Sequence, residues 1–228
     1  MALGQRQYYT LVASLPNLPR FDRAKVLPIS IERLNARGAM LAPEDLAVLD
    51  QALTYFAYER QPVDRTDAQV VAFYQDIMSK TDQPTLRAII DFALSQRTIM
   101  AALRRRHRGL PPPRPGEPRG AGPWVRHIER NWSDANFNLA GVYPWIPECR
   151  QLLESEQPLA LEKRLMGLLW DYVDRLTDGQ YFTFDVVLVY VCKWVLVNRW
   201  LSCDEQAAAT RFEQLLTEVI GGHERIFS

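Results

Sequence analysis

The hydrophobic residues of this chain recur at helical spacing over most of its length. Between residues 42 and 60 they lie three and four positions apart, at Leu46, Leu49, Leu53 and Phe56, which predicts an amphipathic helix. Similar patterns follow a start at Thr66 or Asp67 and another at Pro84. Residues 43 to 107 are therefore predicted to form three antiparallel helices.

The first 40 residues carry weaker patterns. Residues 8 to 15 are apolar and begin with two tyrosines, a pattern compatible with either a strand or the entry to a helical domain. Ser30 is a candidate N-cap for a short helix that carries Leu34.

Proline and glycine interrupt the helical pattern between residues 109 and 123. Their density is incompatible with a helix or a sheet, so the segment is predicted to be an exposed loop or hinge. The chain is then mainly α, a two-lobed helical bundle with an N-terminal helical lobe at 1–108 and a C-terminal helical lobe at 124–228.

The second half has one short and one long helical pattern before its most apolar run. Trp124, Ile128 and Trp132 lie four residues apart, which places them on one face of a predicted helix. Residues 136 to 147 are rich in turn formers and aromatics, and residues 158 to 176 again have the leucine spacing of a helix.

The run from Phe184 to Leu201 is rich in valine, which favours a strand. Its length favours a helix instead, because strands usually have about five or six residues. Its most apolar part, residues 186–197, contains Lys193 and is shorter than the roughly 20 residues that span a bilayer, so we expect a buried core helix and no membrane span. A further helix is predicted from Asp204 to Ile220.

The charge balance narrows the possible partners. Lys plus Arg and Asp plus Glu are equal at 27 each, so no overall field attracts nucleic acid or an anionic membrane. The three cysteines form no CxxC pair, which favours a reducing cytoplasm over a disulfide framework. The N-terminus lacks the pattern of a signal peptide, and we expect a cytoplasmic protein.

The sequence offers little support for catalysis. It contains no phosphate-binding loop, dinucleotide-binding turn, nucleophile elbow or HExxH pair. His127 and Glu129 resemble half of a zinc-deaminase motif, but the required cysteine pair is missing. We expect no catalytic residue, cofactor, metal or small-molecule substrate, and keep an unrecognised enzyme pocket around His127, Glu129 and Asp134 as the least favoured alternative.

Basic and aromatic side chains are the candidates for partner binding. An arginine-rich run ends the third predicted helix, and tryptophans and a further arginine follow the loop. Arginines at a helix C-terminus also complement its dipole, and most tryptophans are expected in the core, so this assignment competes with a purely structural one. The predicted partner-binding residues are Arg104, Arg105, Arg106, Arg108, Trp124, Arg126, Trp132 and Trp145.

Several ordered segments resemble those of an uncharacterised bacterial family encoded among the subunits of V-type (A-type) ATPases. They are residues 8–16, which read YYTLVASLP, residues 122–132, which read GPWVRHIERNW, and residues 198–201, which lead to 211–216. The resemblance extends from near the N-terminus to about Ile220.

That resemblance implies that the chain stands in for the C-type subunit of these enzymes, the counterpart of the eukaryotic d-type subunit. The C-type subunit is an all-helical funnel on the membrane rotor ring that receives the central shaft. The implied function is a non-catalytic central-stalk protein that couples the rotor shaft to the membrane ring and is peripheral to the inner membrane through the complex. The alternative function is a nucleic-acid-associated helical protein that uses the basic segment Arg104–Arg119.

Overall fold

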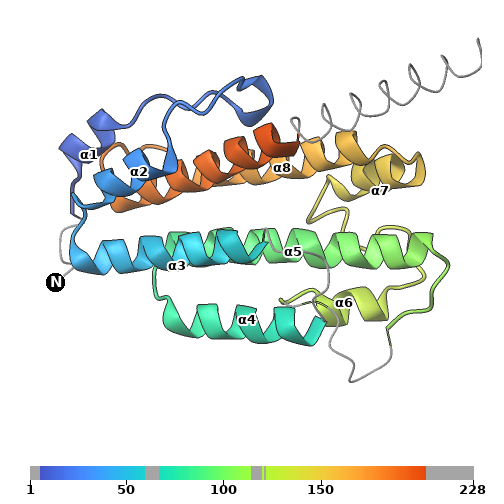
Figure 1. Cartoon of the computed structure of the whole chain (residues 1–228). Helices are drawn as coiled ribbons and strands as arrows, with labels where there is room; N and C mark the ends of the chain where they lie inside the picture. The colour runs from blue at the N-terminus through green and yellow to red at the C-terminus, as the bar shows by residue number, and fades with distance from the viewer. Residues whose placement is uncertain (1–5, 60–66, 114–119, 121, 204–228) are drawn as a thin grey trace, which may run out of the picture.

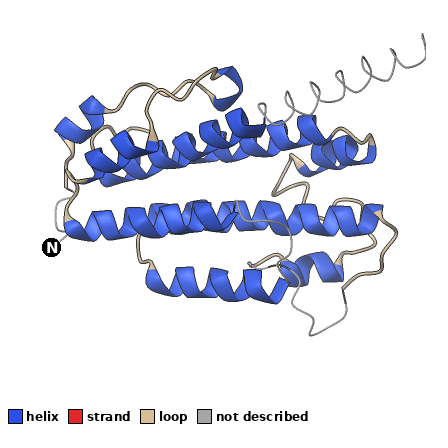
Figure 2. Ribbon diagram, in the orientation of Figure 1, coloured by secondary structure: helices blue, strands red, loops and turns tan. Residues whose placement is uncertain are grey.

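The structure is a computed structural model that describes residues 6–59, 67–113, 120 and 122–203. These residues are mainly helical, as predicted, and form no β-strand beyond a single bridge between Gln7 and Thr183 (Figure 2). The elements are α1 (Tyr9–Ser14), η1 (Phe21–Arg23), α2 (Ile31–Gly38), α3 (Pro43–Glu59), α4 (Asp67–Lys80), α5 (Pro84–His107), α6 (Val125–Arg130), α7 (Ile146–Glu154) and α8 (Pro158–Leu176). The described residues end in a helix over Phe184–Cys203, which is called the last helix below.

Several helices begin where local chemistry predicts. Ser30 caps α2, because its hydroxyl accepts a hydrogen bond from the Arg33 amide at 3.4 Å. The Gln83 side chain accepts from the Leu86 amide at 2.6 Å and so caps α5, which opens with Pro84. The helices predicted from Pro43, from Asp67 and over residues 158–176 are all present.

Two local predictions are resolved or corrected, and a third is not tested. Residues 9–14, for which the pattern allowed a strand or a helix, form α1. The helix that was predicted to carry Trp124, Ile128 and Trp132 on one face ends at Arg130, and Trp132 lies in the turn beyond it. The Asn131 side chain donates to the His127 carbonyl at 2.8 Å, which adds to the bond that the Asn131 backbone amide makes to the same carbonyl at the end of α6. The helix predicted over 204–220 lies outside the described residues.

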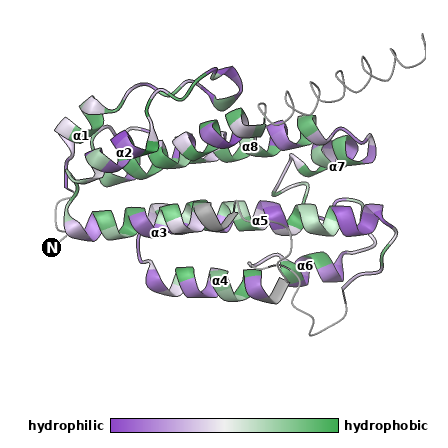
Figure 3. Cartoon of the chain, in the orientation of Figure 1, coloured by the Kyte–Doolittle hydropathy of each residue, from purple (hydrophilic) through white to green (hydrophobic). Residues whose placement is uncertain are grey.

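The predicted three-helix arrangement places α5 at the centre. In Figure 1, α3, α4 and α5 run antiparallel in sequence order, and α8 lies on the other side of α5 from α4. Apolar and polar residues alternate along these helices (Figure 3). The largest core cluster joins Leu86, Ile89 and Ile90 of α5 to α3, to α4 and to Leu188 and Cys192 of the last helix.

A second core cluster lies around the C-terminal half of α5. It joins Ile99 and Leu103 to Ile128 of α6, to Ile146 of α7 and to Leu161 of α8. Residues from both sides of the 109–123 segment therefore share each of the two large clusters, through helix α5. The division into two lobes stays a prediction.

The last helix packs one side into the first cluster, and its helical character confirms the preference for a helix over a strand in this run. Its length and hydropathy, taken alone, would suffice to cross a membrane, a test that no other helix of the described residues passes. Buried core helices pass the same test. Here Trp194 is 4% exposed and donates its Nε1 hydrogen to the Ile29 carbonyl at 2.8 Å, which fixes the last helix against the N-terminal segment.

Candidate partner-binding groove

An open groove of about 1000 Å³ lies over α5, between α4 on one side and α8 on the other. The segment 142–145 lines it together with Pro123 and Trp124, and these residues are called its floor below. We call this feature the α4–α8 groove. Its lining residues are Tyr74, Met78, Arg87, Asp91, Phe92, Ser95, Pro123, Trp124, Val142, Tyr143, Pro144, Trp145, Arg164, Leu168, Asp171, Tyr172 and Arg175.

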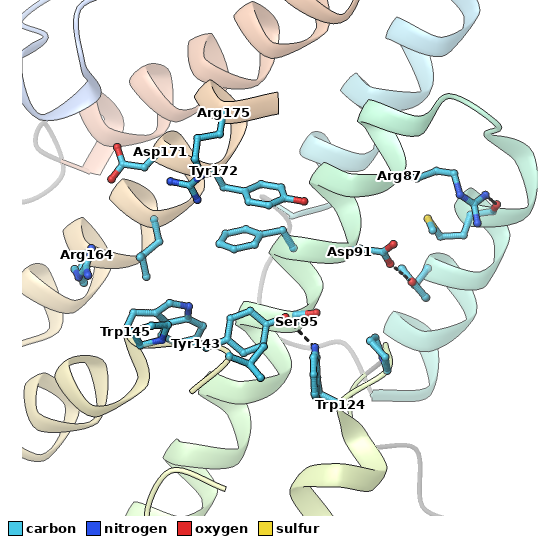
Figure 4. Close-up of a pocket in the computed structure, with 17 residues that line it drawn as sticks. Arg87, Asp91, Ser95, Trp124, Tyr143, Trp145, Arg164, Asp171, Tyr172 and Arg175 are labelled. Atoms are coloured by element: carbon cyan, nitrogen blue, oxygen red, sulfur yellow. Dashed lines mark hydrogen bonds between the residues drawn. The ribbon is translucent and has the colours of Figure 1, made fainter. Parts of the chain in front are cut away.

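Helical periodicity explains how the two main walls are built. Arg87, Asp91 and Ser95 recur every four residues on α5 and line the groove, whereas the neighbouring positions Leu86 and Ile90 are fully buried in the core. Arg164, Leu168, Tyr172 and Arg175 have the corresponding spacing on α8. Both helices therefore present side chains at helical spacing to the groove (Figure 4).

Aromatic side chains hold the centre and the floor of the groove. The rings of Phe92 and Tyr172 stack across the α5–α8 junction, with centroids 4.1 Å apart and planes 8° from parallel. At the floor, Trp124 donates its Nε1 hydrogen to the Tyr143 hydroxyl at 2.8 Å, and the Tyr143 ring lies 5.7 Å from that of Trp145. Burial raises the pKa of Tyr172, with a further contribution from the charge of Asp91. Neighbouring rings therefore preorganise this surface.

The two carboxylates that line the groove already have partners. The Tyr74 hydroxyl donates a hydrogen bond to Asp91. Burial, together with that bond to a negative group, raises the pKa of Tyr74. Asp171 accepts from an Arg20 guanidinium nitrogen at 2.6 Å. Asp91 and Asp171 therefore serve to position other side chains.

The donors in the groove are less fully satisfied. Arg87 donates to the carbonyls of Met78 and Thr81, each at 2.8 Å, and Arg164 pairs with Glu148 at 2.6 Å. In contrast, the Arg175 guanidinium makes no hydrogen bond or ion pair with the described residues, and it is exposed.

A donor without an acceptor is buried beneath the floor. Trp145 is only 5% exposed, and its buried Nε1 has no acceptor among the described side chains and backbone. A buried donor without a partner costs about 1 to 3 kcal/mol, and because this nitrogen is inaccessible it is not a contact point for a molecule in the groove.

The groove includes two of the predicted partner-binding residues, Trp124 and Trp145. The arginine-rich run lies elsewhere, at the end of α5. Arg105 donates to the Pro111 carbonyl at 2.7 Å, and Arg106 donates to the Trp132 carbonyl at 3.0 Å. These bonds tie the segments after α5 back to that helix.

The remaining predicted residues have simpler surroundings. Trp132 is half-buried with its ring 5.4 Å from that of Phe137, whereas Arg104, Arg108 and Arg126 are exposed. Their role in partner binding stays a prediction. Arg175 and Tyr172 were missed because a polar stripe on α8 is typical of any solvated helix face, and only the packing shows that it borders a groove.

In the alternative enzyme pocket, His127 and Asp134 interact with backbone groups of the turn that follows α6. His127 Nε2 lies 3.0 Å from the Phe137 carbonyl oxygen. The Asp134 carboxylate accepts from the backbone amides of Asn138 at 2.9 Å and Asn136 at 2.8 Å, and these bonds lower its pKa. No group of three or more potential metal ligands, with or without Glu129, occurs within the described ranges.

Comparison with known proteins places the chain in a family. Residues 47–222, more than half of the chain, match the family described as protein of unknown function (DUF2764). No curated protein and no solved structure matches the sequence. The chain therefore belongs to the DUF2764 family.

Proposed function

We propose that this DUF2764 protein is a non-catalytic subunit of a bacterial V-type ATP synthase or ATPase. In this role it occupies the position of the C-type subunit in the central stalk and couples the rotor shaft to the membrane ring. It acts on the cytoplasmic side, peripheral to the inner membrane, and its partners are other subunits of that complex.

The observation that carries the proposal is the α4–α8 groove on a stiff helical frame. Tryptophan, tyrosine and arginine are the residue types most enriched at protein–protein hot spots, and here they line one open surface. Ring stacking and hydrogen bonds between lining residues hold that surface in place before any partner binds. A protein that couples two others needs such preformed docking surfaces on a rigid body.

The resemblance of the segments at residues 8–16 and 122–132 supplies the identity of the complex. In the structure the first segment forms α1 and contributes Tyr8 and Leu11 to the core, and the second carries Trp124 into the groove. The helical fold is consistent with the all-helical C-type subunit.

Co-purification from the native host tests the proposal. The full chain, tagged at either terminus and expressed at its natural level, is expected to elute with the catalytic and shaft subunits after gentle membrane extraction. Elution alone under the same conditions would contradict the proposal. Retention on RNA that weakens steeply with salt would favour the nucleic-acid alternative instead.

A further inference from the structure

The shape and the charges of the α4–α8 groove restrict what can bind there. The exposed Arg175 guanidinium borders it without an ion-pair partner among the described residues, while its two carboxylates have internal partners. The surface therefore presents an unpaired positive charge. A ligand that supplies a negative charge at Arg175 is complementary to it.

The shape of the groove fits a helix. Three helices, α4, α5 and α8, border it, and α8 contributes residues from Arg164 to Arg175, about 16 Å of axis at roughly 1.5 Å per residue. A partner helix of about three turns would span that length and lie over α5. Apolar contacts would come from Met78, Leu168 and the aromatic floor.

The lining disfavours a nucleic acid as the occupant. Phe92 and Tyr172 stack on each other at 4.1 Å, so at most one face of each ring is left for a base. Asp91 and Asp171 interrupt the arginines along the groove, which therefore lacks the continuous positive track that a phosphate backbone follows.

We propose that the α4–α8 groove binds an amphipathic helix of a partner protein, with an Asp or Glu of that helix paired to Arg175. Apolar residues of the same face lie against the aromatic floor. The inference deepens the proposed function, since the partner helix would belong to another subunit of the complex.

Site-specific photo-crosslinking in the native host tests this inference with the full chain. The photoreactive amino acid p-benzoylphenylalanine replaces Val142, which is 56% exposed and lines the groove. The control probe replaces Leu159, which is 60% exposed and lies on α8 outside the groove lining. The expected adduct joins residue 142 to a segment of a partner with helical apolar spacing and an acidic residue within one turn, and the control probe does not give it.

Charge reversal then tests the pairing itself. Arg175→Glu is expected to lower the yield of that adduct about tenfold, which corresponds to about 1.4 kcal/mol. Arg130→Glu, an exposed arginine on α6 outside the groove lining, is expected to leave it unchanged. Replacing the acidic residue of the partner by Arg should restore the yield in the Arg175→Glu chain.

Several outcomes overturn the inference. An adduct to a second copy, to residues 204–228 of the same chain or to RNA would contradict it, as would an unchanged yield in Arg175→Glu. The identity of the partner separates this test from that of the proposed function. A matching helix on a protein outside the ATPase would support the groove and sink the function, whereas co-purification with the ATPase without the adduct would do the reverse.

Discussion

Helix α5 has one face that is buried in the core and another that borders the open groove. One face carries Leu86, Ile89 and Ile90, each fully buried, and the last helix covers it. The other carries Arg87, Asp91 and Phe92, and borders an open groove of about 1000 Å³. The covered face is aliphatic and well packed, while the open face is aromatic and polar.

This difference separates stability from recognition within one helix. Aliphatic side chains bury their whole surface and leave no polar atom to satisfy, so the covered face stabilises the fold. Aromatic and arginine side chains keep polar atoms that a partner can reach, so the open face suits binding. Substitutions on the two faces are therefore expected to affect different measurements.

The largest effect is expected on the covered face. Ile89→Ala should lower the free energy of unfolding by about 3 kcal/mol, because it removes buried methyl groups and leaves a cavity. Urea denaturation monitored by circular dichroism measures this loss. Val142→Ala at the rim of the groove is the control, with an expected change within about 0.5 kcal/mol. Similar losses at the two positions would show that the two faces contribute equally to stability.

Alkaline pH is expected to weaken the packing of the last helix on the covered face of α5. Burial raises the pKa of the Cys192 thiol to about 12, from 9.0 for an accessible thiol. The folded state keeps a proton that the unfolded state releases, so this contribution to stability is complete below pH 9 and is lost as the pH rises toward 12. Thermal melts across this range should show a falling midpoint. Cys192→Ala should flatten that fall, and an unchanged slope would contradict the assignment.

A smaller loss of stability is expected at Gly120, which lies against α5. A Cβ at Gly120 would lie 2.9 Å from the side chain of Thr98, and the residue has a φ of +92°. Gly120→Ala should therefore cost about 2 kcal/mol of stability. Gly109→Ala is the matched control, since Gly109 also has a positive φ, +68°, but no atom of the described residues lies within 4 Å of its added Cβ. Equal losses would remove the contact with Thr98 as the cause.

The stacked pair on the open face should contribute less. A double-mutant cycle of Phe92→Ala and Tyr172→Ala is expected to give a coupling energy of about 1 kcal/mol, from the contact between parallel rings 4.1 Å apart. Denaturant unfolding of the four proteins supplies the value. Strict additivity of the two substitutions would show that the rings are not coupled in solution.

The smallest effect on stability is expected at Arg175. Because its guanidinium is exposed and has no ion-pair partner in the described chain, Arg175→Ala should change the free energy of unfolding by less than about 0.5 kcal/mol. A larger loss, measured by urea denaturation, would show that this arginine supports the fold rather than binding.

Periodicity and capping residues predicted the helices, because they act locally. Pro84 opens α5, Ser30 caps α2, and the length of the apolar run favoured a helix at residues 184–201 despite its valines. The groove was not predictable in the same way. It depends on α4, α5 and α8 meeting in space, and only Trp124 and Trp145 of its lining stood out in the sequence.

The arginines at the end of α5 illustrate the same limit. A cluster of cations indicates a charged patch, but tertiary contacts decide which members remain available. Arg106 became an internal brace between α5 and the turn after α6, whereas Arg104 stayed exposed. Sequence spacing could not distinguish these two neighbours.

The fixed ends of the proline-rich segment have a practical consequence for engineering. The Pro111 carbonyl is held by Arg105, and Gly120 lies against Thr98, so the attachment points on either side are set by α5. Because the entropic cost of closing a loop rises only slowly with its length, an affinity tag or a fluorescent protein inserted between these points should leave the bundle intact. Such an insertion would label the protein internally and leave both termini native.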